Sequence, residues 1–517
     1  MMIKKKMKIL DCTLRDGGYY TNWDFDKSVV INYCKTVEKL PIEYIEVGYR
    51  SIPLDGYLGE YFYCPDYVLK ELKSLMPSKK LTIILNEKDI RASHVDELLS
   101  PCIPYISLVR IAVDPSNFER AILLAKAVKR LGFEVAFNVM YMSNWKQDST
   151  FLNLLEGIDD TIDYFYMVDS FGGVFPKDVK EIIDLVKSKT TIPLGFHGHN
   201  NLEMAMANTL TAIDEGCSIV DGTITGMGRG AGNLRTELLL TYFESQKQIQ
   251  IDYTELGNMV YDFEKMKKHY GWGTNLPYMF SGANSLPQKQ VMEWVSMNRY
   301  SLSSILNALN NQKEEKQDNF KLPILKREKK FNTAIILGGG RSVINHNEAL
   351  KRFAANNEDT CIIHAGARNV SDYLEVETKQ YYTLVGIESD KLVKRVGDLS
   401  KLSQVCVYPP FPRKMGTVIP KEIKHLCKEL NSINFTQGHL DSLMAIAIQT
   451  SLDLGVSKIF LAGFDGYDTT INETQFILAE ENQNIINKAL KIDSIDICSI
   501  TPTKYKNIKT RSIYSLL

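Results

Sequence analysis

The chain has 517 residues, of which 44% are hydrophobic and 24% charged, a composition typical of folded globular proteins rather than of disordered or fibrous ones. Its 61 Lys and Arg residues nearly balance 62 Asp and Glu residues, so the overall charge gives no argument for a nucleic acid or an anionic membrane as partner. This length exceeds that of one ordinary hydrophobic core, and two or three domains are therefore expected.

The nine cysteines are scattered without a CxxC pair, and an odd number cannot all pair within one chain. We interpret them as reduced thiols. The opening MMIKKKMKIL is followed at once by charged residues rather than by the apolar segment of a secretory signal. No run of about 18 apolar residues predicts a transmembrane helix. We therefore expect a cytoplasmic protein without a membrane span.

The N-terminal half alternates short β-branched segments with segments of helical periodicity, the pattern of successive βα units. Eight strands are predicted, over residues 8–12, 44–47, 81–85, 105–109, 134–139, 164–168, 193–196 and 218–220. Eight parallel strands with intervening helices indicate an α/β protein with a (β/α)8 TIM barrel rather than an open sheet.

Changes in composition predict the domain boundaries. We assign residues 1–250 to the barrel and the aromatic-rich residues 251–309 to a helical extension. The polar, charged residues 310–330 are predicted as a linker. Residues 331–517 begin a second βα series with too few strands for another barrel, which indicates a smaller, doubly wound, Rossmann-like α/β domain.

Polar side chains follow the predicted barrel strands, and in TIM barrels the catalytic groups lie at these carboxyl ends. The polar residues found there are Arg15, Asp16, Glu46, Asn86, Arg110, Asn138, Asp169, Ser170, His197, His199 and Asn233. So many polar groups at one end of a barrel predict an active site. Among them, we expect Glu46, Arg110, Asn138 and Ser170 to bind substrate.

Two histidines on the seventh strand are candidate metal ligands. His197 and His199 are two residues apart, so the period of a strand directs both side chains to the same face. Asp16, from the neighbouring end of the barrel, would complete a set of two imidazoles and one carboxylate with open positions for substrate. The alternatives are two ordinary polar histidines and a buried salt bridge between Arg15 and Asp16.

A guanidinium beside a metal-bound 2-oxo group can stabilise the oxyanion that forms when a carbon–carbon bond breaks to an enolate. We therefore predict that role for Arg15.

Four motifs in this order and spacing resemble the DRE-TIM metallolyases. They are DCTLRDGG at 11–18, VDSFG at 168–172, GFHGHNN at 195–201 and GMGRGAGN at 226–233. Within this HMGL-like superfamily the chain is most similar to the 4-hydroxy-2-oxovalerate aldolases. The resemblance implies a divalent-metal-dependent aldolase or lyase that acts beside the carbonyl of a 2-oxo acid.

The resemblance also implies residue roles. Asp16, His197 and His199 would bind a manganese, magnesium, zinc or cobalt ion, with Asn233 as a fourth ligand or a residue that supports the ligands. Asp169 would contribute to catalysis or support the site. The small-molecule partners would be a 2-oxo acid and an aldehyde, and we also expect a homo-oligomer.

The chain departs from the aldolases at Tyr19, which stands where they carry a histidine that serves as general base. The DGGYY sequence does not match the DGE sequence of the Claisen-type synthases either. Tyrosine has an unperturbed pKa of about 10, so Tyr19 is predicted either to move a proton or to form an aromatic wall. Two alternative functions follow: Claisen-type acyl transfer from acyl-CoA, and an inactive barrel that serves as a binding scaffold.

In the C-terminal region, ILGGGRSV follows a predicted strand and precedes a helical segment. Gly338, Gly339, Gly340 and Ser342 are candidates to bind a phosphate, although a plain tight turn explains the glycines equally well. Asp465 lies in a GFDG strand end that resembles Rossmann-like bacterial surface-glycan proteins. A nucleotide or nucleotide-sugar ligand and a role in surface-polysaccharide or sugar-acid metabolism are therefore predicted, with a docking module as the alternative.

Overall fold

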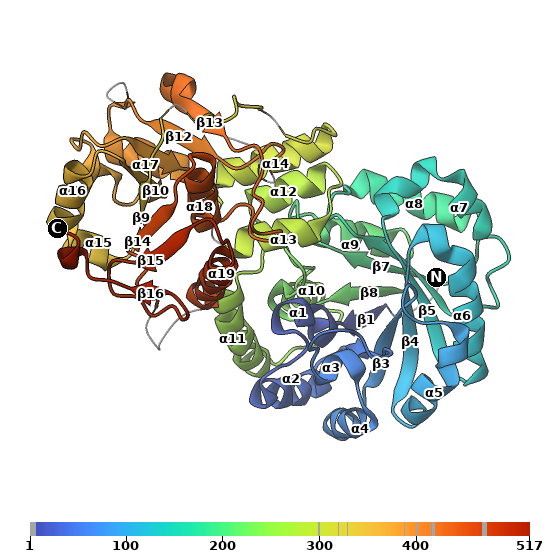
Figure 1. Ribbon diagram of the computed structural model, residues 1–517. Helices are drawn as coiled ribbons and strands as arrows, with labels where there is room; N and C mark the ends of the chain where they lie inside the picture. Colours follow the sequence, from blue (N-terminus) through green and yellow to red (C-terminus); the bar gives the residue numbers. More distant parts are fainter. Residues whose placement is uncertain are drawn as a thin grey trace. The chain divides into compact units, whose positions relative to one another are not determined.

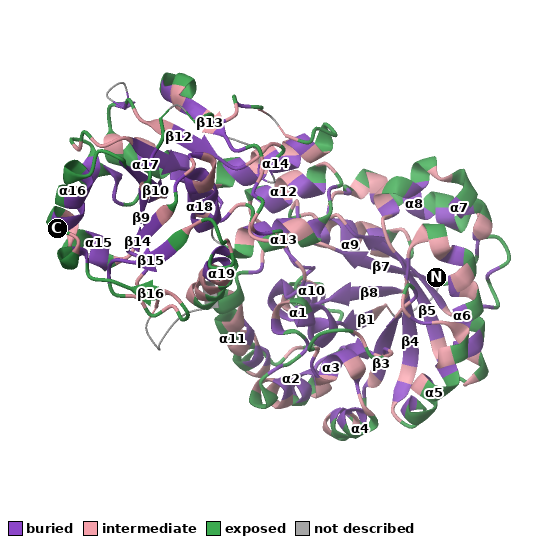
Figure 2. Cartoon of the chain, in the orientation of Figure 1, coloured by how far each residue is buried: buried purple, intermediate pink, exposed green. Residues whose placement is uncertain are grey.

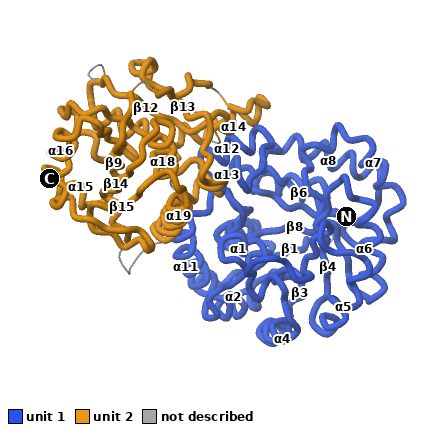
Figure 3. The backbone as a smooth tube through the Cα atoms, in the orientation of Figure 1, with its two compact units in different colours: residues 1–292 blue, residues 293–517 orange. Residues whose placement is uncertain are grey.

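The computed structural model describes residues 7–297, 300–318, 320–327, 329–386, 388–399, 402–413, 415, 419–467 and 473–517. The chain divides into two compact units, residues 1–292 and 293–517 (Figures 1 and 3). Each unit has its own sheet and its own hydrophobic core.

The first unit is a closed barrel of eight parallel strands in sequence order. The strands are β1 (Lys8–Asp11), β2 (Tyr44–Tyr49), β3 (Lys80–Asn86), β4 (Ile106–Val113), β5 (Glu134–Val139), β6 (Tyr164–Asp169), β7 (Leu194–Gly198) and β8 (Ile219–Gly222). β1 pairs with both β2 and β8, which closes the sheet. The predicted TIM barrel is therefore confirmed.

Helices cover the outside of the barrel (Figure 1). They are α1 (Thr13–Thr21), α2 (Lys27–Lys39), α3 (Glu60–Tyr63), α4 (Asp66–Leu75), α5 (Val95–Leu99), α6 (Phe118–Arg130), α7 (Ser149–Leu154), α8 (Pro176–Lys187), α9 (Ala205–Asp214) and α10 (Thr236–Ser245). The sequence of α8 explains its helical structure and its packing on the barrel. Proline occupies its first position, which suits the start of a helix, and its buried residues form one apolar stripe: Val179, Ile182, Ile183 and Val186. Burial on both sides explains why β2 and β6 are buried along their whole length. Figure 2 shows the labelled strands of the barrel largely in purple, as buried.

Three helices follow the barrel: α11 (Tyr253–Tyr270), α12 (Leu276–Ala283) and α13 (Gln288–Ser296). The Asn201 amide, just beyond β7, donates to the Tyr278 carbonyl at 3.0 Å and to the Gln288 side chain at 2.9 Å. This part of the helical extension therefore packs against the carboxyl end of the barrel, beside the polar strand ends.

The second unit contains an open sheet of eight parallel strands in the order β13-β12-β11-β10-β9-β14-β15-β16. They are β9 (Thr333–Leu337), β10 (Thr360–Ala365), β11 (Gln380–Thr383), β12 (Val405–Tyr408), β13 (Cys427–Glu429), β14 (Lys458–Ala462), β15 (Asp496–Ser499) and β16 (Lys509–Thr510). The helices of this unit are α14 (Leu302–Lys313), α15 (Arg341–Asn345), α16 (Asn347–Asn356), α17 (Glu388–Val396), α18 (Leu443–Asp453) and α19 (Glu473–Ala489). The strand order reverses between β9 and β14.

Alternate residues of β9 belong to different hydrophobic cores. Ala334 and Ile336 pack with α18 on one face, whereas Ile335 and Leu337 pack with α16 on the other. This alternation follows from the period of a strand and requires helices on both faces of the sheet. The α/β class expected for the C-terminal region is confirmed, but the expectation of too few strands for another barrel is wrong: the described residues form eight strands, in a sheet that stays open. In the described residues, no helix is long and apolar enough to cross a bilayer.

The segment expected to be a linker, residues 310–330, lies within the second unit. Leu322 is buried, and its backbone N–H donates to the Glu429 carboxylate at 2.8 Å. Leu325 donates to the Glu429 carbonyl, also at 2.8 Å. The unit boundary after Met292 thus differs from the boundary predicted from composition. A polar composition indicates that most side chains of a segment are exposed. It does not show whether a few leucines fix the backbone of that segment to a domain.

A buried histidine makes the second unit sensitive to pH. Burial lowers the pKa of His364 to about 4, and its Nε2 lies 2.8 Å from the Gln380 amide oxygen. Protons therefore bind the unfolded chain more tightly, and stability falls as pH drops from about 6.5 towards 4. We expect this group to cost about 2 kcal/mol of unfolding free energy between pH 7 and pH 5.

Urea unfolding of wild type and His364→Gln at both pH values measures this effect. The variant should lose less stability on acidification, whereas the exposed-site control His425→Gln should behave like wild type. Equal pH dependence in His364→Gln and wild type would show that His364 is not held neutral by the fold.

Candidate active site

The short link between β1 and α1 directs two charged residues into the carboxyl end of the barrel. Asp11, the last residue of β1, accepts hydrogen bonds from the Thr13 N–H at 3.0 Å, Tyr33 Oη at 2.6 Å and Thr236 Oγ1 at 2.6 Å. This buried carboxylate fixes the start of α1, and helical geometry then fixes the residues of its first turn. Asp16 is buried as a result.

The tautomers of both histidines on β7 are set by their neighbours. His197 Nδ1 lies 2.8 Å from the Asp221 carboxylate, and His199 Nδ1 lies 2.7 Å from the Asp169 carbonyl. Each acceptor keeps the proton on Nδ1 and leaves the lone pair of Nε2 available. His197 Nε2 lies 3.6 Å from Asp16 Oδ2. This is the arrangement of two imidazoles prepared to bind a cation together with a carboxylate.

Asn233 joins this group from the loop after β8. Its Nδ2 donates to Asp16 Oδ2 at 2.5 Å, and its buried Oδ1 has no hydrogen-bond partner among the described residues. A buried acceptor without a donor is costly unless a ligand satisfies it. Asn233 Oδ1, Asp16 and the two imidazoles therefore fit a hard or borderline divalent cation.

Burial and nearby charges keep Asp16 and His199 in the forms that bind metal ions. Burial alone would raise the pKa of Asp16, but Arg15, His197 and His199 hold it below its usual value. Burial, together with the nearby His197, lowers the pKa of His199 to about 3. The carboxylate is therefore charged and the His199 imidazole neutral near pH 7, as metal coordination requires.

Cys12, which was not expected at the site, lies beside the ligands. Possible ligand atoms of Cys12, Asp16 and His197 lie within 4.8 Å of one another. Burial raises the pKa of the Cys12 thiol well above its usual value, and Sγ lies 3.5 Å from the Gly222 carbonyl oxygen. The thiol already donates to this backbone oxygen, so we do not include Cys12 among the candidate ligands.

A layer of four side chains from β2, β4, β6 and β8 closes the barrel beneath these ligands. Arg110 lies at its centre, fully buried. Its guanidinium contacts Glu46 at 3.2 Å and Asp221 at 2.6 Å, and lies 4.2 Å above the ring of Tyr166. It also donates to Asn138 Oδ1 at 2.7 Å. Layers from alternate strands are the usual filling of a TIM barrel, but this one is charged.

This network contains three residues with a predicted role. Glu46, Arg110 and Asn138 were predicted to bind substrate; they are buried, and Arg110 bonds to the other two. Substrate binding by them stays a prediction. Glu46 also accepts from Arg15 Nε at 2.7 Å, and Arg15 pairs with Asp16. Sequence reasoning missed Asp221, which joins Arg110 to His197. The only feature of the sequence that could have indicated Asp221 is that a charged residue occupies an inward-facing position of the last strand.

Asp169 and Ser170 hold loops near the site. The Asp169 carboxylate accepts from the Gly173 N–H at 3.1 Å and the Val174 N–H at 3.4 Å, and burial raises its pKa to about 7. Ser170 Oγ accepts from the Tyr141 N–H at 2.8 Å. The contact of Asp169 with His199 is made by its backbone carbonyl, and its side chain shapes the loop after β6.

Aromatic residues on one side of the site include the predicted Tyr19. Its hydroxyl lies 3.3 Å from that of Tyr49, which sequence reasoning did not rank. Burial and the nearby Tyr19 raise the pKa of Tyr49 well above its ordinary value. Tyr19 is 37% exposed and lies under the guanidinium of Arg229, whose Cζ is 5.4 Å from the ring centroid. The pair thus links solvent to the buried interior.

The glycine-rich turn of the second unit is assembled largely by internal hydrogen bonds. Ser342 donates through its N–H to the Asp465 carboxylate at 3.0 Å, and its hydroxyl also bonds to Asp465. Gly340 donates to the Gly463 carbonyl at 2.7 Å. The structure thus brings Gly338–Gly340, Ser342 and Asp465 together, but a carboxylate already occupies the Ser342 donors. Nucleotide binding there stays a prediction.

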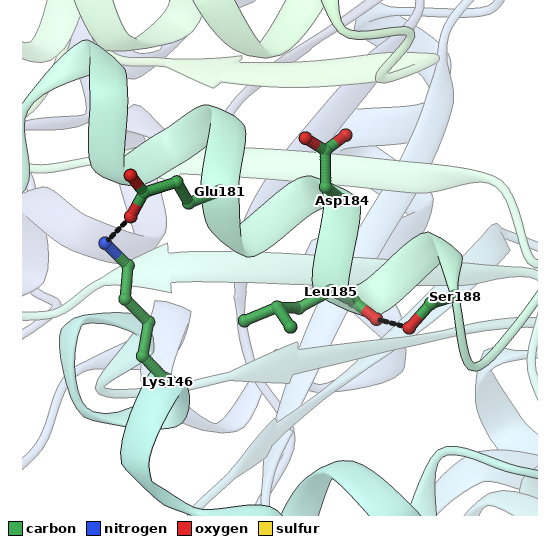
Figure 4. A pocket seen from close by; sticks show the side chains of 5 residues that line it. All are labelled: Lys146, Glu181, Asp184, Leu185 and Ser188. Atoms are coloured by element: carbon green, nitrogen blue, oxygen red, sulfur yellow. Dashed lines mark hydrogen bonds and ion pairs between the residues drawn. The ribbon is translucent and has the colours of Figure 1, made fainter.

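Two hollows lie away from the barrel site. One, of about 430 Å³, is on the outer surface of the barrel, where Lys146 pairs with Glu181 (Figure 4). Lys146 lies there with the carboxylates of Glu181 and Asp184, and this surface set of charges gives no argument for catalysis. The other, of about 460 Å³, lies in the second unit beyond the ends of β11 and β12, and Tyr408, Phe411 and His439 are among its lining residues.

Comparisons with known proteins agree on the barrel. The profile of the HMGL-like family matches residues 110–262. An oxaloacetate decarboxylase of Mycobacterium tuberculosis is 29% identical over 233 residues, which are 45% of this chain and 68% of that protein. A 4-hydroxy-2-oxovalerate aldolase of Carboxydothermus hydrogenoformans is 32% identical over 241 residues, 46% of this chain and 70% of that protein.

Among solved structures, the N-terminal domain of a candidate aldolase from Bacteroides vulgatus is 52% identical to this chain, with a TM-score of 0.56. The match covers 58% of this chain and all of that domain.

The Asp221 carboxylate offers a test of this geometry. In Asp221→Asn, His197 loses its anionic acceptor and Arg110 loses one of its two buried counterions. We expect metal affinity to fall roughly 10- to 100-fold and the free energy of unfolding to fall by about 3–5 kcal/mol. Calorimetric titration with Mn²⁺ and urea unfolding measure the two effects. The exposed-site control Asp184→Asn should change neither, and unaltered Mn²⁺ affinity in Asp221→Asn would contradict the orienting role.

Proposed function

Because the chain belongs to the HMGL-like superfamily of DRE-TIM metallolyases, we propose that Asp16, His197, His199 and Asn233 bind the divalent cation of a 2-oxo acid aldolase. The chain is a metal-dependent carbon–carbon lyase. The proposed reaction cleaves or forms a bond next to the carbonyl of a 2-oxo acid, through an enolate of the pyruvate type.

One observation carries the proposal: Asn233, which donates to Asp16 near His197 Nε2, has a buried Oδ1 without a donor in the described chain. The ring centroid of His199 lies 5.0 Å from that of His197. A divalent cation bound there would polarise the 2-oxo group and stabilise negative charge on its oxygen. Manganese, magnesium, zinc and cobalt all suit such ligands. The relatives named for aldolase and decarboxylase activity disfavour the inactive-scaffold alternative.

Arg15 is positioned to stabilise the enolate. Its Nε donates to Glu46 and its Nη1 to Asp16, which fixes the plane of the guanidinium. Nη2 donates to no described residue, so one cationic N–H group remains for a substrate oxygen. A preorganised donor of this kind acts most strongly when charge develops on the oxygen. Glu46 and Arg110 support Arg15 from below.

The hydroxyl pair of Tyr19 and Tyr49 is the best placed route for protons. A raised pKa makes Tyr49 a proton donor rather than a base near pH 7. Protonation of the enolate carbon therefore suits the pair better than removal of a hydroxyl proton does. This observation favours a second candidate function, decarboxylation of a 2-oxo diacid, because that reaction needs an enolate stabiliser and a proton donor but no base. Claisen-type transfer stays a prediction that an assay for free CoA tests.

Pyruvate enolisation tests the function directly. We expect metal-loaded enzyme to exchange the methyl protons of pyruvate with solvent deuterium, followed by NMR. Arg15→Ala should slow the exchange roughly 100- to 1,000-fold, the cost of removing one oxyanion donor. Arg352→Ala, the matched change at an exposed site of the second unit, should exchange at the wild-type rate. Exchange that persists in Arg15→Ala would refute the assigned role.

The two tyrosines are tested by Tyr19→Phe and Tyr49→Phe. The exchange requires the methyl carbon to lose a proton and then to regain one from the group that protonates the enolate, so loss of that group should slow the exchange roughly 100-fold or more. Mn²⁺ affinity should stay at the wild-type value, because neither hydroxyl is among the proposed ligands. Full exchange rates in both variants would exclude the pair as the proton route.

A further inference from the structure

Arg229 lies in the glycine-rich loop, residues 226–233, that carries Asn233 to the metal ligands. Gly226, Gly230 and Gly232 adopt φ values of +69°, +64° and +77°, which other residues rarely adopt. Three backbone contacts hold the loop: Asn233 N–H to the Gly226 carbonyl at 3.1 Å, Asn200 N–H to the Gly232 carbonyl at 2.8 Å, and Tyr20 Oη to the Gly230 carbonyl at 3.3 Å. The loop therefore presents Arg229 from a fixed backbone.

The Arg229 side chain faces the same site as Asn233. Its guanidinium lies over Tyr19, and its charge contributes to the low pKa of His199. It is half-buried, yet it forms no ion pair with any acid in the described residues. A partly desolvated guanidinium without a carboxylate is suited to bind an anion.

Two residues of α1 show how far Arg229 lies from the proposed metal ligands. Arg15 and Tyr19 are four residues apart, so they lie on one face of the helix, separated by one turn. Arg15 contacts the metal ligand Asp16, whereas Tyr19 contacts Arg229. The site thus has an inner guanidinium beside the proposed ligands and a second one about a helical turn away.

The charges of the site also favour a substrate with two anionic groups. Arg15, Arg110 and Arg229 balance Asp16, Glu46 and Asp221, and a bound divalent cation would leave two net positive charges. The carboxylate of a 2-oxo acid neutralises one of them. A second anionic group on the substrate would neutralise the other.

We propose that Arg229 binds an anionic group on the aldehyde half of the substrate, so that the barrel acts on 4-hydroxy-2-oxo acids whose aldehyde portion carries a carboxylate or a phosphate. The inference rests on the proposed function. In cleavage, the 4-hydroxyl gives its proton to solvent, the C3–C4 bond breaks, and its electron pair forms the enolate. The aldehyde departs with its anionic group unchanged, and C3 takes up a proton, so no other reactant is needed.

The position of Arg229 also discriminates between the two candidate reactions. A carboxylate that leaves as carbon dioxide loses its charge in the transition state, so a cation bound to it would stabilise the reactant and slow the step. An anionic group that stays charged throughout gains binding without this cost. Arg229 therefore favours aldol chemistry over decarboxylation of a diacid.

The test is aldol condensation of pyruvate by the full-length, metal-loaded enzyme with two matched pairs of aldehydes. Glyceraldehyde 3-phosphate is compared with glyceraldehyde, and succinic semialdehyde with butanal. We expect wild type to prefer one or both anionic aldehydes in kcat/KM by roughly 10- to 100-fold, the range of a charged hydrogen-bonded pair. The preferred member identifies the group as phosphate or carboxylate.

Arg229→Gln should lose this preference through a rise in the KM of the anionic aldehyde, and Arg229→Lys should restore part of it. Arg235→Gln, a matched change at an exposed arginine six residues further on, should keep it. Calorimetric titration of glycerol 3-phosphate into the pyruvate-bound enzyme measures binding of the anionic group independently of catalysis. Glycerol is the neutral reference.

Equal use of anionic and neutral aldehydes by wild type, or an unchanged preference in Arg229→Gln, would overturn the inference. In either case, pyruvate deuterium exchange by wild type would leave the proposed function standing. Absence of that exchange would instead refute the function itself.

Discussion

The carboxylate of Asp221 is shared between Arg110 and His197, and this buried interaction determines how the rest of the site is arranged. A guanidinium at the centre of a barrel is costly to bury unless its counterions are fixed around it. Glu46 and Asp221 supply them, at 3.2 Å and 2.6 Å. Because the same Asp221 oxygen accepts from His197 Nδ1, the ion pair that stabilises the barrel also turns the proposed ligand His197 towards Asp16.

On the other side of the site, single carboxylates again contact two or more partners. Glu46 forms ion pairs with both Arg110 and Arg15. Asp16 pairs with Arg15 and also lies within reach of His197 and Asn233. Arg15 and Arg110 thus face the carboxylates of Asp16, Glu46 and Asp221 in the interior, and Arg229 supplies a third positive charge at the outer side. The charged layer makes the floor of the site rigid, while Tyr19 and Arg229 leave its outer side polar and accessible to substrate.

Particular residues show how far sequence reasoning reached. The HxH spacing on a strand, the RD pair after the first strand and the asparagine after the last one indicated groups that the fold does bring together. These predictions depended on local periodicity and on the rule that barrel strand ends share one edge. Glu46, Arg110 and Asn138 were placed at the correct edge, but their burial around one guanidinium was not foreseen. Which inward side chains meet depends on the stagger of neighbouring strands, which no single strand reveals.

The sequence by itself determined the barrel, the candidate ligands and the superfamily, because these follow from periodicity and from motifs whose residues are neighbours in the chain. Only the tertiary structure decided what Asp221, Tyr49 and Arg229 contact. Asp221 meets Arg110 across 111 residues of sequence and His197 across 24. Such pairings are set by closure of the barrel, which brings β8 back to β1 and converts residues that are polar in isolation into one balanced set of charges.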